Sequence, residues 1–215
     1  MKTNLTLAGC GALTLAYTLT STVALAEEKQ GPYAGADLGI ALTGDTALKE
    51  FPGAGRGHHV EFDPGVRLSL GGGWSFCEWF RAGGEFGIIG HNIKGADATF
   101  SEIPFMAVAE FRLPNKSPIV PFIGGGPGFA ISVISLDDDN LGGGDFVDGS
   151  ASDAVFAWQV YGGLRYKIDD HMSVGLVYKY FEAESPTWDV RRTSQDIRFG
   201  RTHTHAISAS FSIDF

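Results

Sequence analysis

The sequence predicts an all-β fold, namely an eight-stranded antiparallel up-and-down transmembrane β-barrel with short periplasmic turns and long extracellular loops. Three observations predict it. Eight segments alternate between apolar and polar residues, which is the period-two pattern of a strand with one apolar face. Each segment is roughly ten residues long, the length that a tilted strand needs to cross a bilayer. The connections between the segments alternate between short and long.

The first four predicted strands each place apolar side chains on one face. In the first, Ala34, Leu38 and Leu42 share a face, and in the third, Phe86 lies on the face opposite Glu85. Because side chains alternate across a strand, one face of each is apolar and the other is polar or small. These strands are predicted over residues 33–42, 60–74, 79–90 and 102–113.

The last four predicted strands follow the same rule, although one of them is uncharged. The stretch 119–136 is long enough for a membrane helix, but its glycine–proline centre at 124–128 argues against one. We therefore interpret it as a strand. The four strands are predicted over residues 119–132, 154–167, 172–181 and 202–215.

Four prolines are difficult to place in a closed barrel, in which every strand is paired on both sides. Each proline removes one hydrogen bond from a ladder. We therefore expect β-bulges or strand ends there, above all within residues 124–128. The prolines concerned are Pro64, Pro104, Pro121 and Pro127.

The connections fall into two groups, and their lengths predict which end of the barrel faces the periplasm. Tight turns on one side and long polar loops on the other are typical of outer-membrane barrels, in which the short turns face the periplasm. The short connections are predicted at 75–78, 114–118 and 168–171, and the long ones at 43–59, 91–101, 134–153 and 182–202.

The polar face distinguishes a membrane barrel from a soluble sandwich or a lipocalin-like barrel, which also alternate. A soluble barrel would turn its charges to solvent. Here the polar face is rich in glycine and serine, as the crowded interior of a small barrel requires. Aromatic residues such as Trp74, Trp79, Tyr166 and Phe215 lie near the strand ends of the apolar face, where they predict an interfacial girdle. We therefore assign seven charges to the lumen: Arg67, Arg81, Glu85, Glu110, Arg112, Arg165 and Lys179.

The N-terminus has the pattern of a cleaved secretory signal peptide over residues 1–26, which leaves one barrel domain at 27–215. A rival interpretation is the lipobox-like stretch Leu7–Cys10, but too short an apolar segment precedes it. Without Lys2, 15 basic and 25 acidic residues remain, a net charge of −10, which excludes nucleic acid as a partner. Cys77 is the single remaining cysteine, so an internal disulfide is excluded.

Three segments carry a resemblance to a known family: YAGADLGIAL at 33–42, PFIGGGPGFAIS at 121–132 and the terminal alternation that ends at Phe215. The chain resembles the small eight-stranded outer-membrane β-barrel proteins of the OmpA transmembrane-domain and opacity-porin type, over essentially the whole mature segment. The resemblance implies the outer membrane of a Gram-negative-type bacterium, with its lipids and lipopolysaccharide as surroundings. It also implies that the terminal face is an assembly signal for the insertion machinery, read by edge pairing. That face comprises Ile207, Ala209, Phe211, Ile213 and Phe215.

Two groups of residues are candidate metal sites. Five histidines map to the long-loop rim, but their spacing fits no strong motif for zinc or copper. The segment 137–153 partly matches a calcium loop, yet Leu141 occupies a ligand position and Asp148 is too short for the usual terminal glutamate. Both groups are explained as ordinary solvated side chains, so we expect the protein to bind neither a metal nor a cofactor. The histidines are His58, His59, His91, His203 and His205.

An enzyme of this fold would pair a histidine with a serine. The nearest pair is His205 with Ser208 or Ser210, and alternation places the histidine outside and the serines inside. We therefore expect a non-enzymatic protein with a structural or surface-interaction role, a largely plugged, charged lumen and an unknown extracellular ligand at its loops. The alternatives left open are a narrow porin-like channel for small solutes and a lipid-modifying outer-membrane hydrolase.

Overall fold

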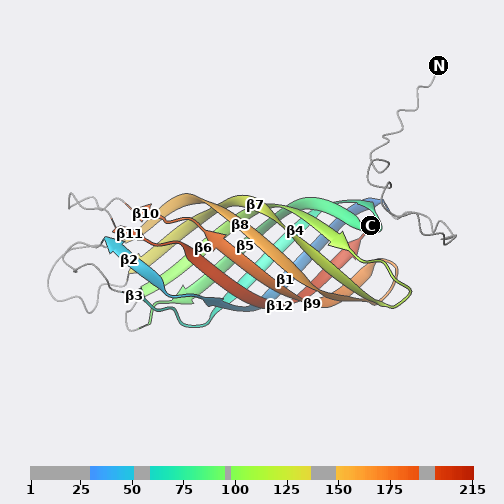
Figure 1. The fold of residues 1–215 in the computed structure, drawn as a ribbon, viewed down its shortest axis with the longest axis horizontal. Helices are drawn as coiled ribbons and strands as arrows, with labels where there is room; N and C mark the ends of the chain where they lie inside the picture. The colour runs from blue at the N-terminus through green and yellow to red at the C-terminus, as the bar shows by residue number, and fades with distance from the viewer. Residues whose placement is uncertain (1–29, 51–58, 95–97, 137–148, 189–196) are drawn as a thin grey trace, which may run out of the picture.

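The computed structural model describes residues 30–50, 59–94, 98–136, 149–188 and 197–215. The predicted signal peptide, His58 and most of the acidic loop lie outside these residues. Eight strands close into an antiparallel barrel, as predicted (Figure 1). The barrel strands are β1 (Gly31–Thr43), β4 (Gly65–Cys77), β5 (Phe80–Asn92), β6 (Ala98–Arg112), β7 (Ile119–Leu136), β8 (Gly149–Lys167), β9 (Met172–Ala183) and β12 (Thr202–Asp214).

The barrel closes where β1 pairs with both β4 and the terminal strand β12. Tyr33 lies opposite Asp214 at one end of the β1–β12 ladder, and Thr43 lies opposite Thr204 at the other. The remaining strands pair in chain order, which is the up-and-down topology. Both described chain ends lie at the end with the tight turns, here called the short-turn end. The opposite end is called the long-loop end.

The boundaries differ from the prediction at the long-loop end. The second barrel strand begins at Gly65 instead of residue 60, and Phe62 before it makes an isolated bridge to Ile93. β7 and β8 are longer than predicted, because their mutual pairing continues to Leu136 and Gly149. At about 3.3 Å per residue, strands of this length extend past an apolar band of about 25 Å.

A second sheet at the long-loop end was not predicted. It has the order β10 (Thr187–Trp188), β11 (Ile197–Phe199), β2 (Thr46–Glu50) and β3 (His59–Val60) (Figure 1). Apart from Val60, which was predicted to begin the second strand, these segments lie within two of the predicted long loops. The central pairing of the sheet, between β2 and β11, joins segments that are distant in the chain, as in the pair of Leu48 with Phe199. A local alternation pattern carries no information about such pairing.

Pro104 in β6 and Pro127 in β7 produce neither the predicted bulges nor strand ends. The β5–β6 ladder breaks off between Phe86↔Phe105 and Ile89↔Glu102, next to Pro104, and resumes in the same register. The β6–β7 ladder does the same beside Pro127. The bulge prediction is therefore wrong at these positions, because the strands tolerate a local loss of hydrogen bonds without inserting a residue. Pro64, by contrast, precedes β4.

Gly126 allows β7 to stay close to β6 at this interruption. A Cβ atom on Gly126 would lie on the carbonyl oxygen of Ala107, at a separation of 1.9 Å. Real Cβ atoms do not approach a backbone oxygen so closely, so a side chain here would push the strands apart. The glycine-rich centre of β7 is therefore a packing requirement.

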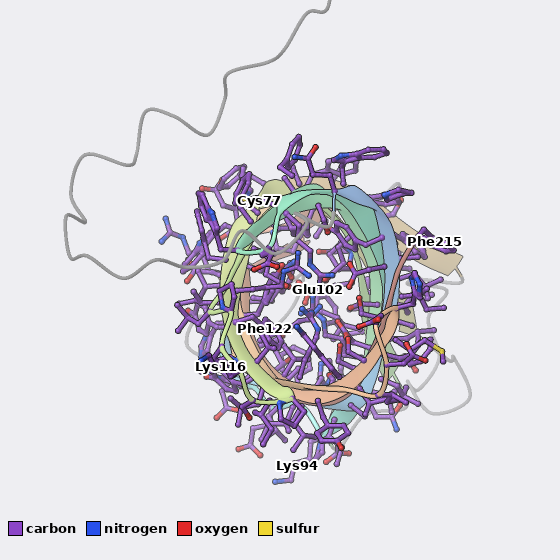
Figure 2. All side chains as sticks on the ribbon, turned by 90° about the vertical axis from the view of Figure 1, so that its right-hand side faces the viewer. Cys77, Lys94, Glu102, Lys116, Phe122 and Phe215 are labelled. Atoms are coloured by element: carbon purple, nitrogen blue, oxygen red, sulfur yellow. The ribbon has the colours of Figure 1, made fainter. Side chains whose placement is uncertain are left out.

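The barrel wall sorts its side chains by face. Apolar side chains such as Leu38 and Leu176 are 58% and 66% exposed on the outside, whereas the inward Arg67 and Lys179 are 0% and 1% exposed. Figure 2 looks along the barrel and shows Glu102 inside the ring of strands, with Phe215 outside. The apolar surface is thus turned outward and the charged surface inward, the reverse of a soluble barrel.

Aromatic side chains cluster on the outer surface near both ends of the barrel. At the short-turn end Phe76, Phe80, Trp79 and Phe111 stack with ring centroids 5.1–6.1 Å apart. Toward the long-loop end, Trp158 packs on Tyr180 at 5.3 Å, on strands β8 and β9. Girdles at the two edges of an apolar band mark the interfaces of a membrane barrel.

Among the described residues, no helix is long and apolar enough to cross a membrane.

Candidate functional site: the charged lumen

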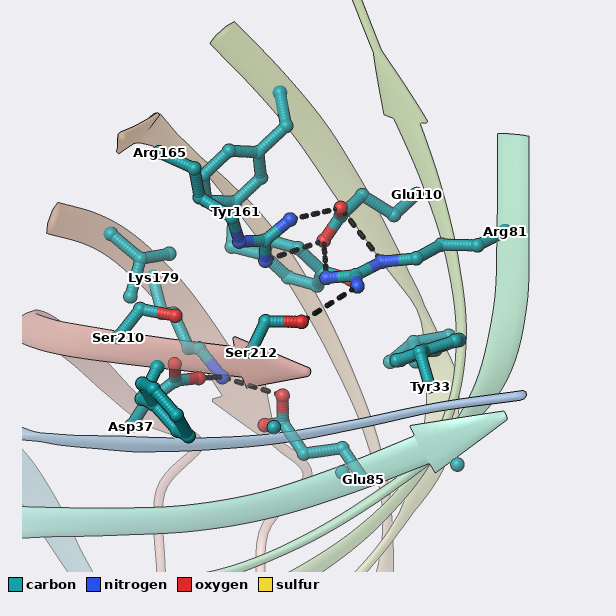
Figure 3. Close-up of a pocket in the computed structure, with 17 residues that line it drawn as sticks. Tyr33, Asp37, Arg81, Glu85, Glu110, Tyr161, Arg165, Lys179, Ser210 and Ser212 are labelled. Atoms are coloured by element: carbon teal, nitrogen blue, oxygen red, sulfur yellow. Dashed lines mark hydrogen bonds and ion pairs between the residues drawn. The ribbon is translucent and has the colours of Figure 1, made fainter. Parts of the chain in front are cut away.

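A three-residue ion cluster occupies the lumen at the short-turn end. Glu110 on β6 lies between two guanidinium groups (Figure 3). Arg165 donates to Oε1 and Oε2 of Glu110 at 2.5 and 3.1 Å. Arg81 donates to Oε2 at 3.1 Å, and its Nε lies 2.9 Å from Oε1. Both carboxylate oxygens are therefore shared between two cations, which makes Glu110 the centre of the cluster.

The strand register explains this cluster. Arg81 on β5 lies directly opposite Glu110 in the ladder, so their side chains share the inner face. Arg165 reaches Glu110 from β8, across β7. Each guanidinium also lies over an aromatic ring: Arg81 is 4.1 Å from the centroid of Tyr33, and Arg165 is 3.9 Å from that of Phe122. These cation–π contacts hold the cations in place after they lose water.

A second ion cluster fills the middle of the lumen around Glu85. Lys179 on β9 lies 2.5 Å from Oε2 of Glu85 and 2.7 Å from the carboxylate of Asp37. Arg67 on β4 donates to Oε1 of Glu85 at 3.1 Å and to the side-chain oxygen of Gln159 at 2.7 Å. Gln159 returns a hydrogen bond to Oε1 of Glu85 at 3.2 Å. The cluster therefore joins strands β1, β4, β5, β8 and β9.

Arg112, the remaining predicted lumen charge, lies at the mouth of the short-turn end. Its Nη1 is 3.7 Å from the carboxylate of Asp214, and its Nη2 donates to the backbone oxygen of Cys77 at 3.3 Å. This cation ties the β4–β5 turn to the end of β12. All seven predicted lumen charges therefore lie inside the barrel, although they divide into two clusters and one separate contact.

A small cavity lies between the two clusters, with a volume of about 40 Å³ (Figure 3). Arg81, Glu85 and Lys179 contribute to its lining. At roughly 10–15 Å³ for each water molecule, it has room for about three waters. It is too small for a solute, so the two clusters close the lumen on either side of it.

Toward the long-loop end, apolar side chains take over the lumen. Ile89, Phe100, Ala157 and Phe181 are fully buried there. Glu102 lies among them and accepts a hydrogen bond of 2.6 Å from Thr202. A polar chain follows, in which the hydroxyl of Thr43 contacts Nε2 of His91 at 2.7 Å and the hydroxyl of Thr204 at 2.6 Å. Ion-paired side chains therefore fill the lumen at one level, and apolar side chains fill it at the next.

The paired clusters affect stability mainly through the cost of breaking them. A buried charge is costly unless it is paired and hydrogen-bonded. Removing one partner of a buried pair typically costs about 3–5 kcal/mol, because the other charge is left uncompensated. The clusters therefore fix the relative positions of facing strands more strongly than they add to the net free energy of unfolding.

Sequence reasoning missed three buried polar residues of the lumen, of which Asp37 and Gln159 belong to the second cluster. Both lie on the polar faces of their strands, and Glu102 lies eight residues before Glu110 on the same face. Alternation alone would have found all three, had every polar residue on the inner face been included. Tyr33 also shares the polar face of its strand with Asp37, but alternation does not indicate that its ring, or that of Phe122, packs against an arginine.

The three predicted rim histidines whose side chains the structure describes do not come together at one site. His91 points inward and also contacts the backbone oxygen of Asp63 at 3.1 Å, whereas His203 and His205 lie on the outer surface of β12. His59 belongs to β3, and its side chain is not described. Within the described ranges, no group of three or more His, Cys, Asp or Glu side chains is placed to hold a metal ion.

The candidate serine–histidine pair is also separated. His205 contacts the hydroxyl of Tyr178 through Nδ1 at 2.6 Å, on the outside of the barrel. Ser208 and Ser210 are buried on the inside. The barrel wall therefore lies between the histidine and both serines.

At the terminal strand, the predicted assembly face points outward. Ile207 and Phe215 are 64% and 69% exposed, and Ala209, Phe211 and Ile213 lie between them along β12. The amide of Phe215 donates to the backbone oxygen of Pro32 at 2.9 Å, so the last residue is tied to β1.

One ion pair lies beyond the barrel wall at the long-loop end. Lys94 follows β5 and donates to Oε2 of Glu61 at 2.9 Å. This hydrogen bond, with the charge of Glu61, raises the pKa of Lys94 above its ordinary value. The pair is largely exposed, so it contributes little to stability.

A closed antiparallel barrel with an apolar exterior, aromatic side chains near both ends and a charged interior defines an integral membrane β-barrel protein. The model of the outer membrane protein beta-barrel domain matches residues 11–215. The chain belongs to this family of outer-membrane proteins from Gram-negative bacteria.

Solved structures support the fold. OprG from Pseudomonas aeruginosa is 14% identical, with a TM-score of 0.59 over 87% of this chain and 97% of that chain. Neisserial surface protein A is 17% identical, with a TM-score of 0.56 over 86% and 97%. Among curated protein sequences, none matches this chain.

Proposed function

We propose that the protein is a structural or surface-interaction component of the outer membrane, with a lumen that is closed to solutes. One observation carries this proposal: two ion-paired clusters and an apolar layer follow one another along the lumen, and the cavity between the clusters is about 40 Å³. An eight-stranded barrel has an interior that side chains just fill. The exposed parts that remain for interaction are the outer surface and the loops.

The lumen geometry argues against the narrow porin-like channel. A conducting path past Glu110 requires that Arg81 or Arg165 leave the carboxylate. It also requires movement of Lys179, which two carboxylates hold. Apolar side chains then line the next level, where ions lose their water at a further cost. We propose that the wild-type barrel does not conduct.

The candidate serine–histidine pair does not support a lipid-modifying hydrolase. Hydrolysis of this kind needs a histidine within about 2.6–3.2 Å of its nucleophile. His205 and the two nearby serines lie on opposite sides of the wall. We propose a non-enzymatic role, in which the loops present a surface to an unidentified extracellular ligand.

Export and assembly follow from the same proposal. We propose that residues 1–26 are removed on export and that lipids and lipopolysaccharide surround the apolar exterior. The terminal face from Ile207 to Phe215 is then the segment that the insertion machinery captures by edge pairing. The net negative charge supports no role in nucleic-acid binding.

The closed lumen is tested by conductance in planar lipid bilayers. The tag-free mature protein is refolded in detergent, and a heat-modifiable gel band shows that the barrel has formed. We expect no sustained openings on the nanosiemens scale, and a K94Q variant, altered outside the lumen, should behave identically. Sustained openings of the folded wild-type protein would overturn the proposal in favour of the channel.

A further inference from the structure

A pair of histidines stands on the outer surface of the terminal strand, in a place that the proposed function does not use. His203 and His205 are two residues apart on β12, so their side chains leave the same face. Their ring centroids are 6.2 Å apart, and the rings meet edge to face. Two imidazoles that share one metal ion have centroids roughly 5–6.5 Å apart, since each metal–nitrogen bond is about 2.0–2.1 Å.

The height of this pair above the short-turn end places it at the membrane surface. Ten residues separate His205 from Phe215. With about 3.4 Å per residue and a tilt near 40°, they rise by about 26 Å, which matches an apolar band of about 25 Å. His205 therefore lies at the extracellular edge of the band and His203 beyond it, where water and dissolved cations have access.

The ring of His205 is already oriented by a neighbour. Nδ1 lies 2.6 Å from the hydroxyl oxygen of Tyr178 on β9. When Nδ1–H donates to this oxygen, the lone pair of the neutral ring is on Nε2. Histidine ligands of metals commonly have such a partner on the other nitrogen, which fixes the tautomer and the ring plane. The ring of Tyr180 packs edge-on against His205 at 5.2 Å.

A carboxylate lies beside the pair. Glu182 is opposite His203 in the β9–β12 ladder. Its carboxylate accepts a hydrogen bond of 2.9 Å from Tyr180 and lies 3.7 Å from the guanidinium of Arg201. Glu182 thus supplies negative charge near the histidines, and Arg201 offsets part of it. Since no third imidazole, thiol or carboxylate of the described residues is placed to join the pair, water would complete the coordination.

We propose that His203 and His205 form a surface binding site for a divalent transition-metal ion, with Tyr178 as its positioning residue. Imidazole suits copper, nickel and zinc, and Cu²⁺ binds a given site most tightly of these. The site takes a hydrated ion from the extracellular side. It is independent of the lumen, so it holds whether the barrel conducts or not.

The experiment is a titration of the folded, tag-free protein in detergent micelles with Cu²⁺, followed by electron paramagnetic resonance. We expect one Cu²⁺ in each chain, with couplings from two imidazole nitrogens. The H203A/H205A variant should lower the affinity by at least about 10-fold. The matched control is H58A/H59A, which removes the two histidines that are adjacent in the sequence. It should leave both the Cu²⁺ affinity and the nitrogen couplings unchanged. A heat-modifiable gel band checks that each variant is folded.

Several outcomes would overturn the site. They are a folded wild-type chain that takes up no Cu²⁺, equal affinity in the wild type and H203A/H205A, couplings from one nitrogen alone, or a loss confined to H58A/H59A. The role of Tyr178 has its own readout. Y178F should weaken Cu²⁺ binding by about 10-fold with both nitrogen couplings retained, whereas Y180F should not. Unchanged affinity in Y178F would contradict its positioning role.

Discussion

The carboxylate of Glu110 bridges Arg81 and Arg165, which belong to strands on either side of it in the barrel. Its oxygens contact Arg165 at 2.5 and 3.1 Å and Arg81 at 2.9 and 3.1 Å. A single acidic side chain thereby serves as the shared counter-ion of two cations that are almost wholly removed from water. The stability of the short-turn half of the lumen depends on this residue more than on either arginine.

Replacement of Glu110 tests this dependence. E110Q leaves two buried guanidinium groups without a counter-charge, and we expect it to lower the free energy of unfolding by about 3–5 kcal/mol. Urea unfolding in lipid vesicles measures the change. The control is E61Q, which breaks the exposed pair with Lys94 and should change the free energy of unfolding far less than E110Q does. Equal effects of the two variants would contradict the cluster's role.

The orientation of the apolar face is tested by a matched pair of leucines. Leu176 and Leu113 are 66% and 65% exposed, but Leu176 lies within β9 and Leu113 lies in a short turn. L176R should lower the free energy of unfolding in a bilayer by about 2–4 kcal/mol, whereas L113R near the interface should cost about 0–1 kcal/mol. Equal small effects would indicate that the outer face meets water instead of lipid.

Close strand packing at Gly126 gives a third prediction. G126A places a methyl group against the carbonyl oxygen of Ala107, so we expect a loss of about 1–3 kcal/mol, the usual range for overpacking. G90A is the control, because the nearest atom to its Cβ would be 3.9 Å away. The difference is measured by urea unfolding in vesicles. Similar stabilities for the two variants would show that β6 and β7 separate without cost.

Removal of Phe215 tests the terminal face as an assembly signal. We expect deletion of Phe215 to reduce the amount of heat-modifiable protein in the outer membrane of expressing cells. Refolding of the purified variant into detergent should be nearly unaffected, because the deletion removes one backbone hydrogen bond to Pro32. The control is F76S, which removes an outward aromatic from β4. A deletion that impairs refolding and membrane insertion equally would indicate a plain structural strand.

The strands of the barrel could be predicted from sequence because the burial of one face and the exposure of the other recur every second residue. The same rule places Arg81, Glu110 and Arg165 inside. It does not say which cation meets which carboxylate, because contacts such as Arg165 with Glu110 cross an intervening strand. The outer sheet was missed for a related reason: β2 and β11 pair across the length of the chain. The bulges expected at Pro104 and Pro127 are absent, since tertiary pairing on the other side holds the register.

The pairing of β2 with β11 has a mechanical consequence for the barrel. β2 extends from the connection after β1, and β11 from the connection before β12, so these two segments bind each other directly beyond the seam where the wall closes. Separation of β1 from β12 would also require the pairing between β2 and β11 to break. Two sets of strand pairings therefore hold the first and last barrel strands together: β1 with β12 inside the bilayer, and β2 with β11 above it.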